Sequence, residues 1–210
     1  MKSVGIICEY NPFHNGHLYH IKKVKELYPD YVVIAVINGD FTQRGDVSLI
    51  DKWQKTEVAL NYVDLVVELP FVFGTQAADI FTKGGADILN ALKVDAFVFG
   101  SESSDINKLR KIVEIQENME YSDKIKQYLD EGLSYPTSLA KALKDLGIVL
   151  ENNPNDLLGI GYIRNLKGVE IKAIKRTNDY HSLDLNKISS ATSIREALKN
   201  GTDVREYVPK

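Results

Sequence analysis

Two kinds of sequence pattern alternate along the first hundred residues of the chain. Short apolar runs rich in β-branched residues lie at 3–10, 31–39, 64–70 and 95–102, and stretches with helical spacing separate them. Continuous apolar runs between helices are typical of parallel strands that are covered on both faces. Because crossovers between such strands are right-handed, the pattern predicts an α/β fold with a doubly wound parallel sheet.

The second half of the chain has a different pattern. The stretch from about 105 to 165 is helical and charged, and VEIKAIKRT at 169–177 predicts a fifth strand. A last helix is expected to begin at a Ser or Thr of SATSIREALKNG and to end at Gly201. We therefore expect one domain over 1–210 with a helical insertion at about 105–165.

The composition is that of an ordinary globular protein, with 44% hydrophobic and 26% charged residues. No apolar run approaches the roughly 20 residues that span a bilayer, and MKSVGIICEY turns acidic too early for a secretory signal. The single cysteine, Cys8, excludes an internal disulfide and is expected to be an inert buried thiol. A net charge of -3 argues against strong nucleic-acid binding by this chain alone. We expect a cytoplasmic protein without a membrane partner.

The heptapeptide NPFHNGH follows the first apolar run directly and precedes a helical pattern. His14 and His17 can point to the same side of this turn, and Gly16 allows a ligand to approach the backbone closely. The free N–H groups of the helix start form an anion site, and imidazole donors beside it suit a phosphate chain that gains charge during a reaction. The alternative is a turn whose histidines only cap the helix.

A second helix start, ISSATSIR, carries Ser189, Ser190, Thr192, Ser193 and Arg195. Hydroxyls and free N–H groups with a guanidinium one turn further can hold another phosphate, although the segment alone can equally be an N-cap. The loops NPFHNGH, NGDFTQRGD and GSESSD all follow predicted strands, at the edge where ligands bind in such sheets. The two helix starts together predict that both ends of one triphosphate are held.

Other signatures are incomplete or absent in the sequence. The GIG of Gly159 to Gly161 has Arg164 where the third glycine of a dinucleotide fingerprint belongs, and it follows no strand. The sequence contains no GxxxxGK[ST] loop, no Cys/His set with zinc spacing and no nucleophile elbow. We expect no protein-bound metal site.

The motifs, taken in order, resemble a known family. HxGH after the first strand with a late ISSxxxIR is similar to the HIGH-type nucleotidyltransferases, a superfamily with a Rossmann-like fold. The longer set CEYNPFHNGHLYH, NGDFTQRG, DKWQKTEVAL, DLVVELPFVF, FGSE, PNDLLGIGYIR, KRTNDYH and ISSATSIREAL resembles the bacterial tRNA(Met) cytidine acetate ligases over essentially the whole chain. NPFHNGH together with FGSE and SATSIR is specific, whereas HxGH alone indicates only the superfamily.

The resemblance implies a two-step reaction whose partners are ATP, acetate and elongator tRNA(Met). Acetate attacks the α-phosphorus of ATP, which gives acetyl-adenylate and pyrophosphate. The exocyclic amine of the wobble cytidine then takes the acetyl group, which gives N4-acetylcytidine and AMP. Mg²⁺ is expected with ATP, and the sequence indicates neither a ligand for it nor an oligomeric state.

By the same resemblance, the expected catalytic residues are His14, His17 and Arg195. The imidazoles are expected to stabilise phosphate charge and not to act as bases, because a carboxylate nucleophile has no proton to remove. Ser190 and Thr192 are expected to steady the pyrophosphate. The residues expected to bind ATP are Ile7, Cys8, Glu9, Tyr10, Asn11, Pro12, Phe13, His14, Asn15, Gly16, His17, Leu18, Tyr19, His20, Gly100, Asn155, Arg176, Ser190 and Thr192.

Two features depart from the family pattern. A second Asn is expected where Asp156 follows Asn155, and family members are expected to continue past the equivalent of YVPK into a region that supplies most of the tRNA surface. This chain is then expected to activate acetate yet to modify tRNA poorly. Two other functions stay open: a small-molecule adenylyltransferase, and a nucleotide- or tRNA-binding module without turnover.

Overall fold

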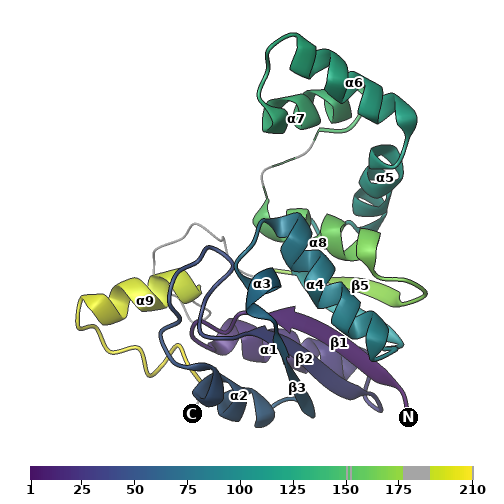
Figure 1. Ribbon diagram of the computed structural model, residues 1–210. Helices are drawn as coiled ribbons and strands as arrows, with labels where there is room; N and C mark the ends of the chain where they lie inside the picture. Colours follow the sequence, from purple (N-terminus) through teal and green to yellow (C-terminus); the bar gives the residue numbers. More distant parts are fainter. Residues whose placement is uncertain (150, 152, 177–189, 210) are drawn as a thin grey trace.

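Five parallel strands form one sheet in the order β3-β2-β1-β4-β5 (Figure 1). The computed structural model describes residues 1–149, 151, 153–176 and 190–209. The strands are β1 (Ser3–Cys8), β2 (Val32–Asn38), β3 (Leu65–Leu69), β4 (Ala96–Ser101) and β5 (Glu170–Lys175). The predicted α/β fold with a doubly wound parallel sheet is confirmed. Strand order reverses at β1, between β2 and β4, so the ligand-binding edge of such a sheet lies where β1 and β4 end.

Helices occupy most of the intervals between the strands. Those of the described part are α1 (Asn15–Leu27), α2 (Lys52–Leu60), α3 (Phe71–Gly74), α4 (Ala78–Ala91), α5 (Ile106–Gln116), α6 (Met119–Asp130), α7 (Tyr135–Asp145), α8 (Pro154–Asn165) and α9 (Ala191–Lys199). The predicted ends of α9 are confirmed: Ser190 caps its start, and Gly201 follows its end with φ +70°. The short α3 was not predicted. No helix in the described ranges is long and apolar enough to cross a membrane.

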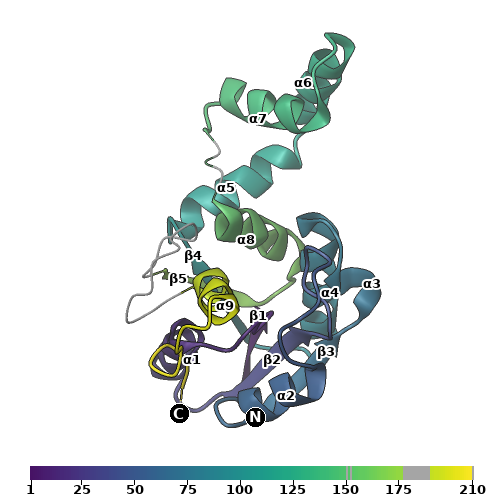
Figure 2. The same cartoon turned by 90° about the vertical axis from the view of Figure 1, so that its left-hand side faces the viewer.

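Side chains of each strand alternate between two apolar cores, one on each face of the sheet. In β2, Val33, Ala35 and Ile37 join the core under α1 and α2, while Ile34 and Val36 join the core under α4 and α8. Figure 2 shows α1 and α4 on opposite sides of β1. Burial of both faces explains why β1, β2 and β4 have continuous apolar runs, whereas the edge strand β5 contains three charged residues.

The chain between β4 and β5 forms the helices α5 to α8. Figure 1 shows α5, α6 and α7 extending away from the sheet, whereas α8 lies against the same face as α4. The start of α8 is thereby placed beside the end of β4, at the ligand-binding edge.

Two glycines of α8 permit this close packing. A Cβ on Gly159 would overlap the ring of Phe99 in β4, and a Cβ on Gly161 would overlap the side chain of Thr82 in α4. Thr82 cannot move aside easily, because its hydroxyl donates a hydrogen bond of 2.7 Å to the carbonyl of Ala78. The GIG segment therefore has a packing role, which agrees with its rejection as a dinucleotide fingerprint.

Replacing Gly161 with Ala should lower the free energy of unfolding by about 1–3 kcal/mol, as overpacking typically does. The loss is expected even though alanine favours a helix over glycine by about 1 kcal/mol. Urea denaturation measures the effect, with Ser122→Ala at an exposed position of α6 as the control. A Gly161→Ala variant as stable as the wild type would contradict the close contact between α8 and α4.

Candidate functional site

The HNGH turn lies at the carboxyl end of β1, where α1 begins. His14 is the N-cap of α1: the N–H of Gly16 donates to its Nδ1 (3.0 Å), and its own N–H donates to Nδ1 of His17 (3.3 Å). The two rings stack with their centroids 3.8 Å apart. Capping, the alternative to a ligand site, is therefore present, but it uses only one nitrogen of each ring.

The cap determines which ring nitrogens can reach a ligand. Because Nδ1 of His14 and of His17 accepts a hydrogen bond, a neutral ring carries its proton on Nε2. Burial, reinforced by the charges of Arg176 and Arg195, lowers the pKa of His14 to about 4. Burial also lowers the pKa of His17 well below its usual value, and that of His20 to about 4. The imidazoles are thus uncharged at neutral pH, and the Nε2–H groups of His14 and His17 donate to no acceptor among the described residues.

The start of α9 lies against the HNGH turn. Nη1 of Arg195 donates to the carbonyl of Asn11 (2.7 Å), and Nη2 donates to Oγ1 of Thr192 (3.3 Å). The hydroxyl of Ser190 accepts the N–H of Ser193 (3.1 Å), which is an N-cap bond. The two helix starts, far apart in the sequence, are therefore neighbours. Ser189 lies outside the described residues.

A third border of this region comes from β4, α8 and β5. A Cβ on Gly100 would lie 3.4 Å from Cγ of Arg176, and Nη1 of Arg176 donates to Oδ1 of Asn155 (3.5 Å). Arg176 also contributes to the lowered pKa of His14, and of His17 and His20, so it lies near the histidines. Within the described part, Nε of Arg176 and Nε2 of His20 are buried without a hydrogen-bond partner. A bound anion could satisfy such donors.

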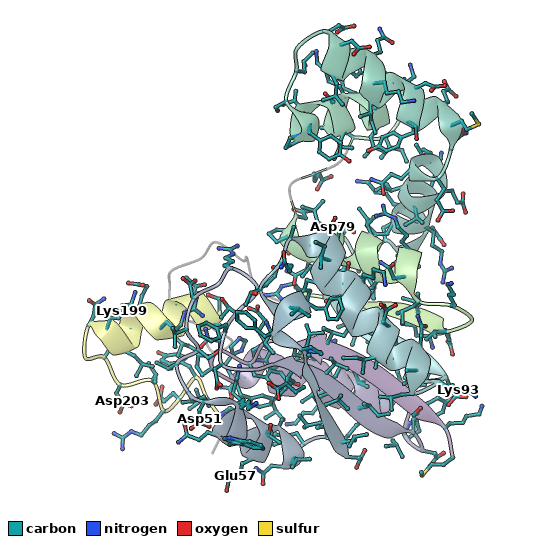
Figure 3. All side chains as sticks on the ribbon, in the orientation of Figure 1. Asp51, Glu57, Asp79, Lys93, Lys199 and Asp203 are labelled. Atoms are coloured by element: carbon teal, nitrogen blue, oxygen red, sulfur yellow. The ribbon has the colours of Figure 1, made fainter. Side chains whose placement is uncertain are left out.

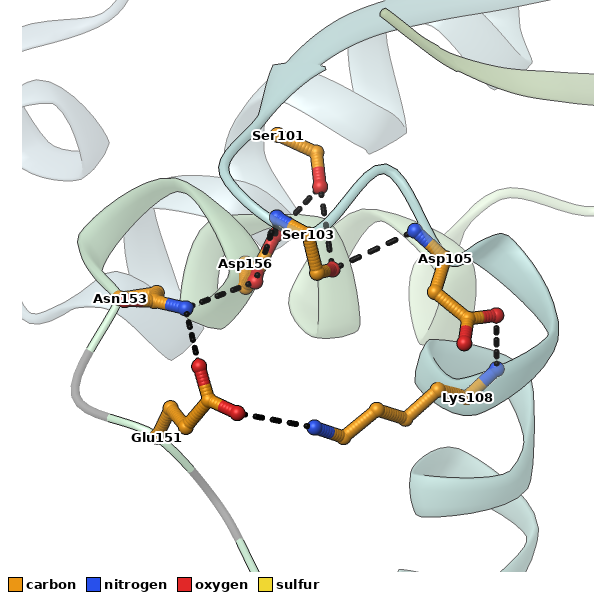
Figure 4. A network of polar contacts seen from close by, with 7 residues as sticks. All are labelled: Ser101, Ser103, Asp105, Lys108, Glu151, Asn153 and Asp156. Atoms are coloured by element: carbon orange, nitrogen blue, oxygen red, sulfur yellow. Dashed lines mark hydrogen bonds and ion pairs between the residues drawn. The ribbon is translucent and has the colours of Figure 1, made fainter. Parts of the chain in front are cut away.

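Asp156, where the family pattern leads one to expect Asn, is buried and has a structural role. Its carboxylate accepts hydrogen bonds from the hydroxyl of Ser101, the N–H of Ser103 (3.2 Å) and Nδ2 of Asn153 (3.3 Å) (Figure 4). All three partners are hydrogen-bond donors, which suits a carboxylate. An Asn at this position would direct its own NH₂ donors towards one of them. The departure therefore leaves the neighbouring Asn155 in place at the site.

Glu102 is a residue of this region that the sequence reasoning missed. Its Oε2 accepts the N–H of Asp156 (3.0 Å), and its Oε1 accepts Nδ2 of Asn155 (2.5 Å). The carboxylate thus ties the end of β4 to the positive end of α8 and orients Asn155 towards Arg176. The sequence feature that could have indicated Glu102 is its position in FGSE, directly after a predicted strand.

The loop after β2 forms the remaining border. The N–H of Gln43 donates to Oε1 of Glu9 (2.6 Å). The ammonium of Lys55, buried under this loop, donates to the carbonyl of Gly39 (2.5 Å) and to the hydroxyl of Ser48 (3.0 Å). Burial lowers the pKa of Lys55. Lys55 was not predicted, because a lysine in a helical pattern usually lies on a solvated face.

Many side chains of the predicted ATP-binding stretch 7–20 serve the fold. Burial raises the pKa of the Cys8 thiol to about 12, which keeps it uncharged. Asn15 donates to the chain after α9, from its backbone N–H to the carbonyl of Tyr207 and from Nδ2 to the carbonyl of Glu206. The side chains that pack in the two cores are Ile7, Cys8, Tyr10, Phe13 and Leu18.

The donor set of this region suits an anion. It consists of imidazole N–H groups, two guanidinium groups and the start of α9. The free N–H groups expected at the start of α1 are not free, because those of Asn15 and Gly16 donate to Tyr207 and His14 and those of His17 and Leu18 donate to the carbonyl of His14. Among the residues that the structure describes, no group of three His, Cys, Asp or Glu side chains could hold a metal ion.

Similarity to known proteins agrees with this geometry. Residues 1–210 match the family described as HIGH Nucleotidyl Transferase. The chain is 43% identical over 209 residues to a tRNA(Met) cytidine acetate ligase of Fusobacterium nucleatum, covering 97% of this chain and 52% of the relative. It is 42% identical over 220 residues to the protein of that name from Caldicellulosiruptor saccharolyticus, covering 100% of this chain and 55% of the relative.

Solved structures show the same relationship. Thermotoga maritima TmcAL bound with alpha-thio ATP is 37% identical, with a TM-score of 0.89, and the match covers 100% of this chain and 53% of that one. The apo form matches with a TM-score of 0.93 and 55% of its length covered. The chain thus spans about half the length of the relatives it matches, and the predicted resemblance to the tRNA(Met) cytidine acetate ligases is confirmed. Since the family match extends over every residue, the chain belongs to the HIGH nucleotidyltransferase family.

Proposed function

We propose that this chain activates acetate with ATP and that the acetyl group is transferred to the wobble cytidine of elongator tRNA(Met). The observation that carries the proposal is the pair of neutral Nε2–H donors on His14 and His17, beside the guanidinium of Arg195. Such donors match a phosphate chain. The relatives named tRNA(Met) cytidine acetate ligase and the ATP analogue bound by TmcAL support ATP as the nucleotide.

In the first step, a carboxylate oxygen of acetate attacks the α-phosphorus of ATP, and the bond to the bridging oxygen of pyrophosphate breaks. Negative charge grows on the departing phosphates, and no proton has to be removed from the nucleophile. His14 and His17 therefore donate hydrogen bonds from Nε2 and are not bases. Arg195, Thr192 and the start of α9 hold the leaving pyrophosphate.

In the second step, the N4 amine of cytidine attacks the acyl carbon of acetyl-adenylate. AMP leaves, and the amine loses one proton. Activation is required because the amine lone pair is delocalised into the ring and free acetate is a poor electrophile. We propose that residues 1–210 act as one nucleotidyltransferase-like domain, with α5 to α8 as an insertion, and that the longer relatives use their additional length for tRNA.

Within this proposal, Gly100, Asn155 and Arg176 form the nucleotide side of the site. Gly100 has no side chain, and the aliphatic part of the Arg176 side chain lies next to it. The guanidinium of Arg176 is held in place by its hydrogen bond to Asn155. Mg²⁺ arriving with ATP would be held chiefly by phosphate oxygens and water.

Exchange of radiolabelled pyrophosphate into ATP tests the first step. Exchange that requires acetate supports the proposal, because reversal of the reaction needs acetyl-adenylate. Exchange that requires a phosphorylated metabolite instead would identify a small-molecule adenylyltransferase. Absence of exchange, with ATP still bound, would leave a binding module without turnover.

The His17→Asn substitution should separate the capping role of His17 from its phosphate role. The Asn oxygen replaces Nδ1 as the acceptor for the N–H of His14, but no donor replaces Nε2–H. We expect a folded protein whose acetate-dependent exchange falls by about a hundredfold, as after loss of one oxyanion donor.

The matched control is His17→Gln, whose terminal amide places a donor where Nε2 stood while the cap acceptor is lost. This variant should keep exchange within about tenfold of the wild type and lose stability by about 1 kcal/mol. Wild-type exchange in His17→Asn would show that the Nε2–H group does not act on the phosphates.

The buried histidines should make the free energy of unfolding depend on pH. Their folded pKa lies below the unfolded value of about 6.5, at about 4 for His14 and His20, so the unfolded state binds more protons between these limits. The contribution of these histidines to the free energy of unfolding is then fully present above pH about 6.5. It decreases towards pH about 4, by up to about 1.4 kcal/mol per pH unit for each histidine. Urea denaturation from pH 7 to 5 measures this slope. His20→Gln should reduce it, and an unchanged slope in that variant would contradict the lowered pKa.

A further inference from the structure

The segment after α9 returns to the HNGH turn. The N–H of Asn15 donates to the carbonyl of Tyr207 (3.0 Å), and Nδ2 of Asn15 donates to the carbonyl of Glu206 (2.9 Å). Figures 1 and 2 both show this segment passing from the outer end of α9 back to α1. The variable residue of the HNGH motif thus holds a segment that lies almost two hundred positions later in the sequence.

These bonds change the role of Asn15. Its backbone N–H and one N–H of Nδ2 are engaged with the carbonyls of Tyr207 and Glu206, so these two bonds hold the segment 204–207 and do not point to a nucleotide. The helix α9 is consequently held to the turn at two places, by Arg195 on the carbonyl of Asn11 and by the following segment on Asn15. The two attachment residues lie on either side of His14 in the sequence, so the position of α9 relative to the imidazoles depends on both.

We propose that Asn15 is a positioning residue, which clamps the segment 204–207 and thereby holds Thr192 and Arg195 of α9 opposite His14. This inference rests on the proposed nucleotide function of the site. Because coupling between two binding events is reciprocal, ATP that uses α9 must stabilise the clamp by the same factor by which the clamp favours ATP.

The clamped segment contains a trypsin cleavage site that can report its opening. Arg205 lies just before Glu206, and its side chain is 88% exposed, so trypsin can recognise it. Figure 3 shows the neighbouring Asp203 at the surface beyond α9. Cleavage after Arg205 requires the chain at Glu206 to leave Asn15, because a protease binds its substrate in an extended form. The rate at which residues 206–210 are lost therefore measures opening of the clamp.

The experiment compares the wild type, Asn15→Ala and the control Asn107→Ala, which removes an exposed Asn from the first turn of α5. Without nucleotide, Asn15→Ala should be cleaved after Arg205 about fivefold faster, as expected for loss of one hydrogen bond. Asn107→Ala should match the wild type. Equal cleavage rates in all three proteins would overturn the clamp.

The link to the nucleotide has its own measurement. Saturating ATP should slow cleavage of the wild type after Arg205, because bound ATP stabilises the clamped segment by the coupling factor. ATP that binds the wild type without slowing cleavage would overturn the positioning role and leave the proposed function standing. No ATP binding by the wild type would overturn the proposed function, and nucleotide-free cleavage would still test the clamp.

Discussion

The reciprocal cap between His14 and His17 is the interaction on which the site depends. Each ring uses Nδ1 to accept a backbone N–H, so the proton of a neutral imidazole must be on Nε2. Burial keeps both rings neutral. The same two bonds therefore begin α1 and prepare the donors. A helix cap and a phosphate site are alternatives when the sequence is considered alone. In the structure the cap uses only Nδ1 of each ring, so it is compatible with the proposed phosphate site at Nε2.

The rest of the fold brings other donors to this cap. The switch in strand order places the ends of β1 and β4 side by side, and the close packing of α8 on α4 and β4 brings Asn155 to the same edge. Asp156 and Glu102 then hold the start of α8 to the end of β4 through directed hydrogen bonds. Arg195 connects α9 to the turn. A site assembled from so many separate elements depends on their relative positions more than on any one residue.

Two arginines support the proposal that a chain with net negative charge holds a triphosphate. The guanidinium groups of Arg176 and Arg195 lie near neutral histidines. Neither group forms an ion pair with a carboxylate of the described residues. Each donates to neutral oxygens instead. Two cationic donors are thus present at the site of a chain whose formal net charge is -3.

The sequence by itself determined the parallel sheet, the helix ends and the family, because apolar periodicity, capping residues and the HNGH and SATSIR motifs are local signals. It also identified the two helix starts, which the structure brings together. Only the tertiary structure decided the state of the histidines, since their pKa depends on burial and on distant arginines. The roles of Glu102, Lys55 and Asn15 were decided there too, because their partners lie far away in the chain and no local pattern encodes a contact across the fold.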